Sequence, residues 1–204
     1  ALGTAHLLGY KLARNFNMPY LATSIGDYWR RWHMTLSRWL RDYLFIPLGG
    51  SRGSAWMADR NLLITMTLGG LWHGPNWMYV SWGVLQGVYL VVHRHFRSFC
   101  QGRPRLDALL QSVPGTGLRV AATFLSVCAG YVVFRSPGFG AAGTMLWRLV
   151  VPHAGLDTPV HSRSFWYTAA AVVLFHAAGC LGVWKGLRGQ APAMAVGFGY
   201  ALAL

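Results

Sequence analysis

The sequence is poor in acidic residues: it has no glutamate, and its five carboxylates are all aspartates, set against 18 lysines and arginines. Charged residues make up only 11% of the chain, whereas 54% of it is hydrophobic and the mean hydropathy is +0.34. Soluble globular domains usually carry about 25% charged residues. This composition argues against a water-soluble globule, and its hydrophobic content excludes a disordered chain.

The shortage of acidic residues leaves a formal net charge of +13, which favours an anionic partner. Many of the arginines lie between apolar stretches, as in residues 94–119, rather than along one face of a soluble fold. We therefore expect contact with anionic membrane lipid and no binding of nucleic acid.

Several catalytic signatures are also missing. The three cysteines are odd in number and far apart, which excludes a disulfide framework and a zinc knuckle. His93 and His95 stand two positions apart with no third ligand nearby, so we expect no metal site and assign them to the membrane interface. The sequence has no nucleophilic serine elbow, phosphate loop or carboxylate pair. Of the catalytic mechanisms considered, only general-base catalysis by a histidine remains as a candidate.

Uncharged stretches bounded by basic residues predict the membrane spans, because a helix needs about 20 apolar residues to cross a bilayer. Residues 61–93 contain no Asp, Glu, Lys or Arg and are interrupted by Gly69, Gly70, Gly74 and Pro75, which predicts two helices meeting at a break. Within the second half, Gly83 and Gly87 form a GxxxG pattern, most simply a helix-packing contact. The further predicted spans are residues 120–134, 164–184 and 191 onward.

These spans predict an all-α, polytopic integral membrane protein. The basic segments 94–119 and 185–188 are separated by two crossings, so the positive-inside rule places both in the cytoplasm and residues 135–163 in the periplasm. The chain begins with alanine and ends inside an apolar run, so we expect it to be a fragment of a longer protein.

Residues 15–50 have a different pattern. Ser24 followed by Asp27 marks a helix start, and aromatic and apolar residues then repeat at helical spacing until Pro47. This predicts one amphipathic helix that lies in the membrane interface or packs against the spans rather than crossing the bilayer. Asp42 is four residues from Arg38, a spacing that favours a structural ion pair. The basic residues here could also hold an anionic donor.

Two histidines are candidates for chemistry. His73 lies in the predicted helix break among leucine, tryptophan and glycine, where desolvation disfavours a charged imidazole, so it would act as a base. A hydrogen bond tying two helices together is the alternative reading. His33 lies on the amphipathic helix. For this residue a packing role beneath the aromatic stripe is as good an explanation as a role in the chemistry. His176, inside a predicted span, is explained as well by helix packing.

Four segments of the chain form a distinctive set of motifs. They are RNFNMPY at residues 14–20, YWRRWHMTLS at 28–37, WLRDYLFIPLGG at 39–50 and GGLWHGPNW at 69–77. Together they resemble the membrane-bound O-acyltransferase superfamily, in its bacterial alginate O-acetyltransferase branch. A weaker match is Tyr-Val-Val-Phe-Arg at residues 131–135.

The resemblance implies a many-helix fold with interfacial amphipathic helices in the bacterial inner membrane. Residues 1–204 would be the C-terminal portion of one membrane-embedded domain, with a catalytic core at 14–95 and C-terminal transmembrane helices at 117–204. His73 matches the superfamily's catalytic histidine, and His33 its second active-site position. The candidate substrate-binding residues are Trp72, Asn76 and Arg41.

The implied activity is transfer of an acetyl group from a thioester to hydroxyls of an exported polysaccharide such as alginate. Acetyl-CoA would be the donor with no bound cofactor, the acceptor a polysaccharide or an acyl carrier, and the partners periplasmic acetylation proteins. The alternatives are D-alanyl or other acyl transfer to a cell-envelope polymer, a non-catalytic scaffold, or a transporter. A transporter would usually carry repeated broken helices or an intramembrane carboxylate, and the sequence shows neither.

Overall fold

The computed structural model describes residues 4–5, 8–151 and 162–180, and every element of three or more residues within them is helical, as predicted. Contacts divide the chain into two units, residues 15–153 and residues 1–14 with 154–204. In the second unit the described helix is α9 (Ser162–Cys180). The elements of the first unit are η1 (Pro19–Leu21), α2 (Ile25–Arg31), α3 (Met34–Leu40), η2 (Arg41–Phe45), α4 (Ala55–Trp72), α5 (Trp77–Gln101), α6 (Pro104–Gln111), α7 (Val113–Arg135) and α8 (Phe139–Val150).

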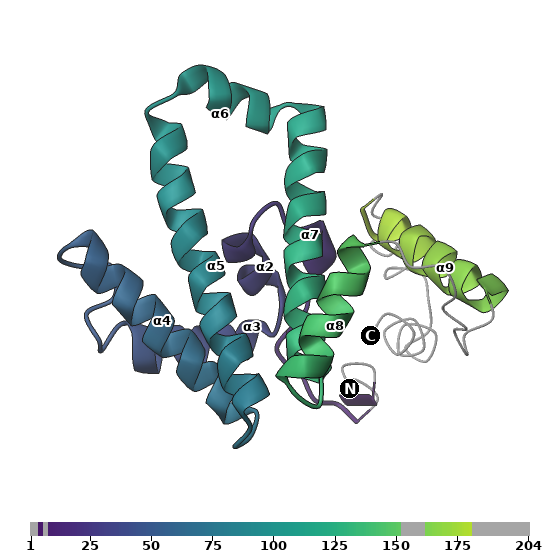
Figure 1. The fold of residues 1–204 in the computed structure, drawn as a ribbon, viewed down its shortest axis with the longest axis horizontal. Coiled ribbons are helices and arrows are strands. Elements are labelled where there is room, and N and C mark those ends of the chain that lie inside the picture. The colour runs from purple at the N-terminus through teal and green to yellow at the C-terminus, as the bar shows by residue number, and fades with distance from the viewer. Residues whose placement is uncertain (1–3, 6–7, 152–161, 181–204) are drawn as a thin grey trace. The chain divides into compact units, whose positions relative to one another are not determined.

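The helices α4 and α5 form a close-packed hairpin whose turn is the predicted break (Figure 1). A Cβ atom added to Gly83 would lie 2.5 Å from the carbonyl oxygen of Met66, and one added to Gly87 would lie 3.1 Å from the Cα of Leu63. The two backbones approach so closely only because these positions lack side chains. The expected helix-packing role of Gly83 and Gly87 is therefore confirmed.

The predicted amphipathic helix begins where expected but is not continuous. The Ser24 hydroxyl accepts a hydrogen bond from the Asp27 amide at 3.1 Å and caps α2. Trp32 then has extended backbone and His33 is left-handed at φ 42°, so the single-helix prediction is wrong and the segment divides into α2 and α3. Asn15 holds the junction, because its side-chain oxygen accepts from the Thr35 amide and hydroxyl at 3.0 and 2.6 Å.

The expected Asp42 ion pair also takes a different partner. Arg41 donates to Asp42 at 2.7 Å, whereas Arg38 donates to the carbonyl oxygen of Met34 at 3.3 Å. After α3 the backbone widens into the π-helical segment η2 instead of continuing as an α-helix. The predicted Arg38–Asp42 hydrogen-bonded pair is thus wrong, because the α-helical geometry it required ends at residue 40.

The helix α7 is the part of the described chain best suited to cross a bilayer. Its 23 residues have a mean hydropathy of 1.7 over the best window, and at 1.5 Å per residue it is about 34 Å long. It covers the predicted span 120–134 and begins earlier, because Ser112 caps the Gly115 amide. Among the described residues no other helix passes the same test of length and hydropathy, so crossing by α4 and α5 stays a prediction.

Most of the basic segment 94–119 is helical rather than a loop. It comprises the end of α5, all of α6 and the start of α7, and α6 joins the other two helices at one end (Figure 1). Of the later spans, residues 164–184 overlap α9. Residue 191 onward, the basic segment 185–188 and the His176 side chain lie outside the described residues, and of segment 135–163 the structure describes α8 but not residues 152–161.

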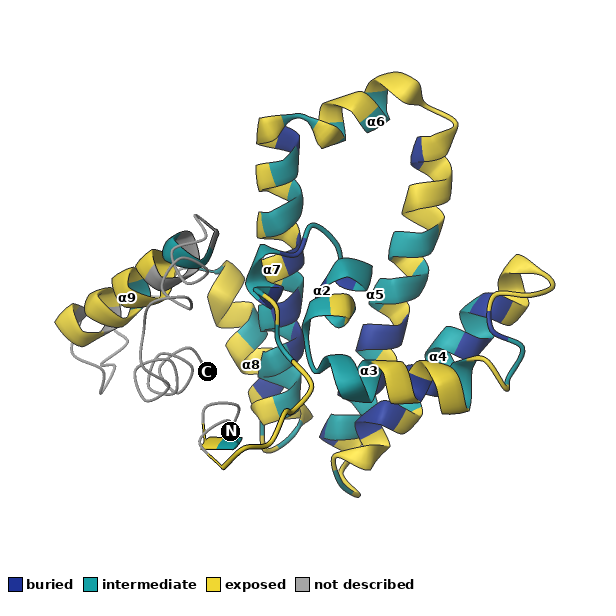
Figure 2. Cartoon of the chain, turned by 180° about the vertical axis from the view of Figure 1, so that it is seen from behind, coloured by how far each residue is buried: buried dark blue, intermediate teal, exposed yellow. Residues whose placement is uncertain are grey.

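The packing between α2 and α7 fixes the position of the His33 segment. Ile25 and Tyr28 of α2 are buried together with Val127 of α7, and the Tyr28 and Tyr131 hydroxyls are 3.0 Å apart. Much of the remaining α7 surface is intermediate or exposed (Figure 2). The helix α2 therefore packs against the buried face of α7.

A cluster of polar side chains connects the start of α4 with the end of α5. His95 Nε2 lies 2.7 Å from Asp59 Oδ2, and Arg94 donates both to the other carboxylate oxygen and to the Ala55 carbonyl. Partial burial raises the pKa of Asp59, but the hydrogen bonds from His95 and Arg94 outweigh it and hold this pKa below its usual 3.8. Both histidines of the expected interfacial pair thus belong to α5, and His95 is a hydrogen-bond partner of Asp59.

We expect Asp59→Asn to lower the midpoint of thermal unfolding at neutral pH. A carboxylate whose pKa falls on folding adds stability above its unfolded pKa and loses it as the pH falls through the folded pKa. The difference between wild type and variant should therefore be present at pH 7 and shrink below about pH 4. Asp107→Asn, in the exposed helix α6, is the control, and we expect it to change the unfolding midpoint only slightly. If Asp59→Asn lowered the midpoint by the same amount at every pH, the charge-based account would be contradicted.

Candidate active site

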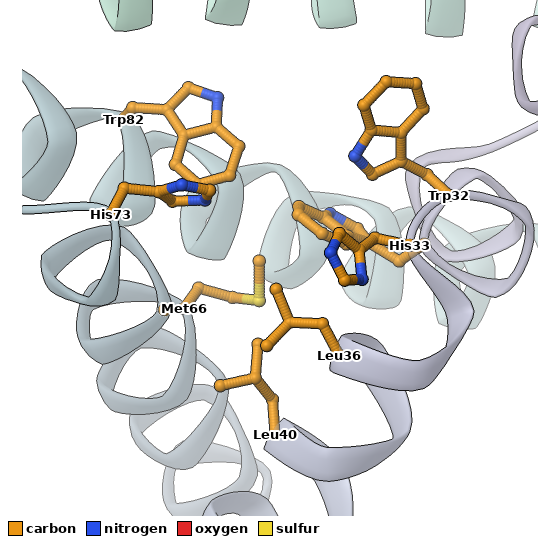
Figure 3. Close-up of a pocket in the computed structure, with 9 residues that line it drawn as sticks. Trp32, His33, Leu36, Leu40, Met66, His73 and Trp82 are labelled. Atoms are coloured by element: carbon orange, nitrogen blue, oxygen red, sulfur yellow. The ribbon is translucent and has the colours of Figure 1, made fainter. Parts of the chain in front are cut away.

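A small, partly enclosed pocket brings the two candidate histidines together. Although they are 40 positions apart in the sequence, His33 and His73 both line a cavity of about 30 Å³, enough for one or two small groups such as a water or a carbonyl. Figure 3 shows His73 and Trp82 on one side of the pocket and His33 on the other. The full lining is Trp29, Trp32, His33, Leu36, Leu40, Met66, Gly69, His73 and Trp82.

His73 is placed by the break between α4 and α5. It is the C-cap residue of α4, and Gly74 follows with φ 145°, a backbone conformation that favours glycine. Three aromatic rings contact the imidazole, with centroids 5.1 to 5.4 Å away, although the residue as a whole remains exposed. These rings belong to Trp72, Trp82 and Phe134.

His33 is placed by the break between α2 and α3. Left-handed backbone is uncommon for a residue other than glycine and is often found at functional sites, where surrounding contacts maintain it. Its Nδ1 atom is buried and has no hydrogen-bond partner. The edge of Phe16 packs against the ring at a centroid separation of 6.2 Å. The same break that overturns the single-helix prediction therefore sets the His33 imidazole in the pocket wall.

The pocket lining suits a neutral imidazole acting on a small polar group. None of its nine residues is a carboxylate, lysine or arginine, and the two histidines are its only titratable groups. A neutral imidazole has one nitrogen free to accept a proton and one that donates. Such a pair can remove a proton from a hydroxyl and hydrogen-bond a second atom of the reactants.

A wider, more open cavity adjoins this pocket. It has a volume of about 360 Å³ and shares His33 and Leu36 with the partly enclosed one. Thr35, Trp39 and Trp72 complete its lining. Because His33 and Leu36 belong to both linings, the open cavity is a route by which a reactant could approach the histidines.

The predicted substrate-binding residues are placed differently from one another. Trp72 lines the open cavity and packs against His73. Asn76 is the N-cap of α5, where its side-chain oxygen accepts from the Met78 amide at 2.8 Å, and Arg41 is exposed and paired with Asp42. Neither Asn76 nor Arg41 lines either cavity, so substrate contacts by these two remain predictions.

Sequence reasoning did not single out Trp29, Trp82 or Met66 for the site. In the sequence Trp29 is one member of an aromatic stripe, and Trp82 and Met66 are ordinary apolar residues of predicted helices. Only the juxtaposition of α2, α4 and α5 shows that they share a pocket. The described residues contain no group of three or more metal-ligating side chains.

Comparisons with known proteins point to one family. The sequence model of the membrane-bound O-acyltransferase family matches residues 1–133. A protein named probable alginate O-acetylase AlgI, from Azotobacter vinelandii, is 42% identical over 73% of the chain and 27% of its own length. A Helicobacter pylori protein named peptidoglycan O-acetyltransferase is 39% identical over 74% and 27%, respectively.

A more distant relative is named for the transfer of a different acyl group. The Bacillus subtilis protein named teichoic acid D-alanyltransferase is 30% identical over 68% of the chain and 36% of its own length. The chain therefore spans about a quarter to a third of the length of these relatives. The matched region includes both histidines and the four helices that carry the pocket lining, α2, α3, α4 and α5.

Proposed function

Because the chain belongs to the membrane-bound O-acyltransferase family, we propose that it catalyses transfer of an acetyl group from a thioester to hydroxyls of a cell-envelope polysaccharide. The observation that carries this proposal is the partly enclosed pocket, which joins His33 and His73 without any carboxylate or cation in its lining. Such a site provides a base among aromatic and apolar side chains.

In the proposed reaction His73 is the general base. Its imidazole takes the proton of the acceptor hydroxyl while the hydroxyl oxygen attacks the thioester carbonyl carbon. The new C–O bond forms, the C–S bond breaks, and His73 returns the proton to the departing sulfur, so the products are an ester and a free thiol. A positioned base typically contributes about 10² to 10⁴ in rate.

His33 has a different part in the same step. Its buried Nδ1 lacks a protein partner, and His33 also lines the open cavity from which a reactant would come. We assign it the role of orienting the acceptor or donating a hydrogen bond to the negative charge that develops on the carbonyl oxygen. This division leaves proton removal to His73.

Acetyl transfer is favoured over D-alanyl transfer by the relatives' names and similarities. The two more similar relatives are named for O-acetylation, at 42% and 39% identity, against 30% for the one named for D-alanylation. Acetyl-CoA is the proposed donor, with alginate or a related polysaccharide, or an acyl carrier serving one, as acceptor. Periplasmic acetylation proteins are the proposed partners, and a multi-pass position in the bacterial inner membrane is the proposed location.

The experiment that tests this function uses membranes containing the protein as its gene encodes it. Acetyl-CoA labelled in the acetyl group is added with alginate, peptidoglycan or neither, and alkali-labile label is counted on polysaccharide and on membrane carriers. We expect labelled ester and an equal amount of free thiol. Absence of both products, with the protein present in the membrane, would favour a scaffold or transporter; label only with a D-alanyl donor would favour the alternative transfer.

We expect His33→Gln to keep part of the activity where His73→Gln does not. Glutamine can still donate and accept hydrogen bonds but is not a base at neutral pH. The same acetyl-transfer assay separates the two roles, with protein abundance measured in each membrane. Equal and complete loss in both variants would mean that the histidines act as one unit, against the division into a base and an orienting group.

A further inference from the structure

The indole nitrogen of Trp29 is a second buried polar atom without a partner. Among the described residues three buried side-chain nitrogen or oxygen atoms have no hydrogen-bond partner: Trp29 Nε1, His33 Nδ1 and Gln86 Oε1. Two of these three belong to residues that line the partly enclosed pocket. The unsatisfied atoms therefore concentrate where the chemistry is proposed.

The chemistry of the indole group restricts what could satisfy it. The N–H of tryptophan only donates, so its missing partner must be an acceptor. Leaving a buried donor unpaired is costly because the lost hydrogen bonds to water are not replaced, and native structures rarely keep one without reason. Trp29 lines the pocket that also holds both histidines, so a reactant bound in that pocket is the nearest candidate acceptor for its indole N–H.

The surrounding rings fix the orientation of Trp29. Tyr28 and Trp82 each meet its ring edge to face, with centroids 5.7 and 5.9 Å away. Trp82 in turn packs against His73 at 5.4 Å. The indole is thus held by its neighbours, one of which also contacts the proposed base.

We propose that the Trp29 indole N–H donates a hydrogen bond to the carbonyl oxygen of the acyl group during transfer, beside His33. This inference rests on the proposed function. As the hydroxyl oxygen attacks, the C=O electron pair moves onto that oxygen, and two donors then share its negative charge. When the C–S bond breaks, the pair returns to form the ester carbonyl, and the proton held by His73 goes to the thiolate.

The test replaces Trp29 with phenylalanine, which keeps an aromatic ring and removes the donor. Removing one such donor costs about 10² in rate, so we expect kcat for acetyl transfer to fall about 100-fold with little change in KM for acetyl-CoA. Trp56→Phe is the matched control, because Trp56 is 68% exposed at the start of α4 and lines neither cavity. An unchanged kcat in Trp29→Phe would overturn the proposal.

A spectroscopic readout separates this hydrogen bond from a packing role and from failure of the proposed function. Acetyl-CoA labelled with ¹³C at the carbonyl is bound without acceptor, and its carbonyl stretch is followed by isotope-edited infrared difference spectra. A hydrogen bond lowers the frequency in wild type and Trp56→Phe, and the lowering should be reduced in Trp29→Phe. Equal frequencies in all three proteins would overturn the Trp29 assignment even if transfer is observed, whereas the expected shift without any transfer would refute the proposed function alone.

Discussion

Replacing His73 with alanine is expected to abolish acetyl transfer while the protein still accumulates in the membrane. His73 is the imidazole held at the α4–α5 break, and the only other titratable group in the pocket is His33. Losing the base should lower kcat at least about 100-fold. The measurement is labelled acetyl transfer per unit of protein, with thermal unfolding in detergent recorded in parallel.

His95→Ala is the matched control for this prediction. His95 also lies on the α4–α5 hairpin, but it is paired with Asp59 and lines neither cavity. We expect it to retain activity near the wild-type level. Added imidazole should restore part of the rate in His73→Ala, because the deleted ring leaves space beside the pocket. Wild-type turnover by His73→Ala would remove the histidine from the mechanism.

Gly83→Ala is expected to destabilise the α4–α5 hairpin strongly. The new methyl group would lie 2.5 Å from the Met66 carbonyl oxygen and 3.1 Å from the Cα atoms of Gly70 and Thr67, all of them backbone. Backbone cannot move aside as a side chain can, so we expect a cost of about 3 kcal/mol. The midpoint of thermal unfolding and the amount of folded protein in the membrane both measure it.

Gly117→Ala tests whether that loss comes from steric contact rather than from the substitution itself. Gly117 lies inside α7, and a Cβ atom there would meet nothing within 4 Å. Alanine is better suited than glycine to a helix interior by about 0.5 to 1 kcal/mol. Its effect should therefore be neutral or stabilising. Similar destabilisation by both substitutions would contradict the close-packing account.

Sequence patterns predicted the features that depend on neighbouring residues. The break after Trp72 followed from glycines and a proline, and the Ser24 cap followed from its spacing to Asp27. The GxxxG pattern in α5 correctly indicated close packing. The positions of His73 and His33 came from their motifs, although no pattern in either motif shows that the two rings share a pocket.

Features set by distant contacts were beyond such patterns. The periodic aromatic stripe continues through His33, so it predicted one helix; the left-handed turn is held by Asn15, about 20 residues away. The burial of Trp29 Nε1 depends on α5 as well as α2. Asp59 likewise found partners more than 30 residues away, at the far end of the hairpin.

The most direct test of the central claim is the pH dependence of kcat/KM for acetyl transfer by the wild-type protein and His73→Gln. If His73 removes the hydroxyl proton as a neutral imidazole, kcat/KM should rise about tenfold per pH unit while the imidazole is protonated and then level off. The residual transfer by His73→Gln should lack that rise. A flat wild-type profile, or the same rise in both proteins, would contradict the assignment of His73 as the base.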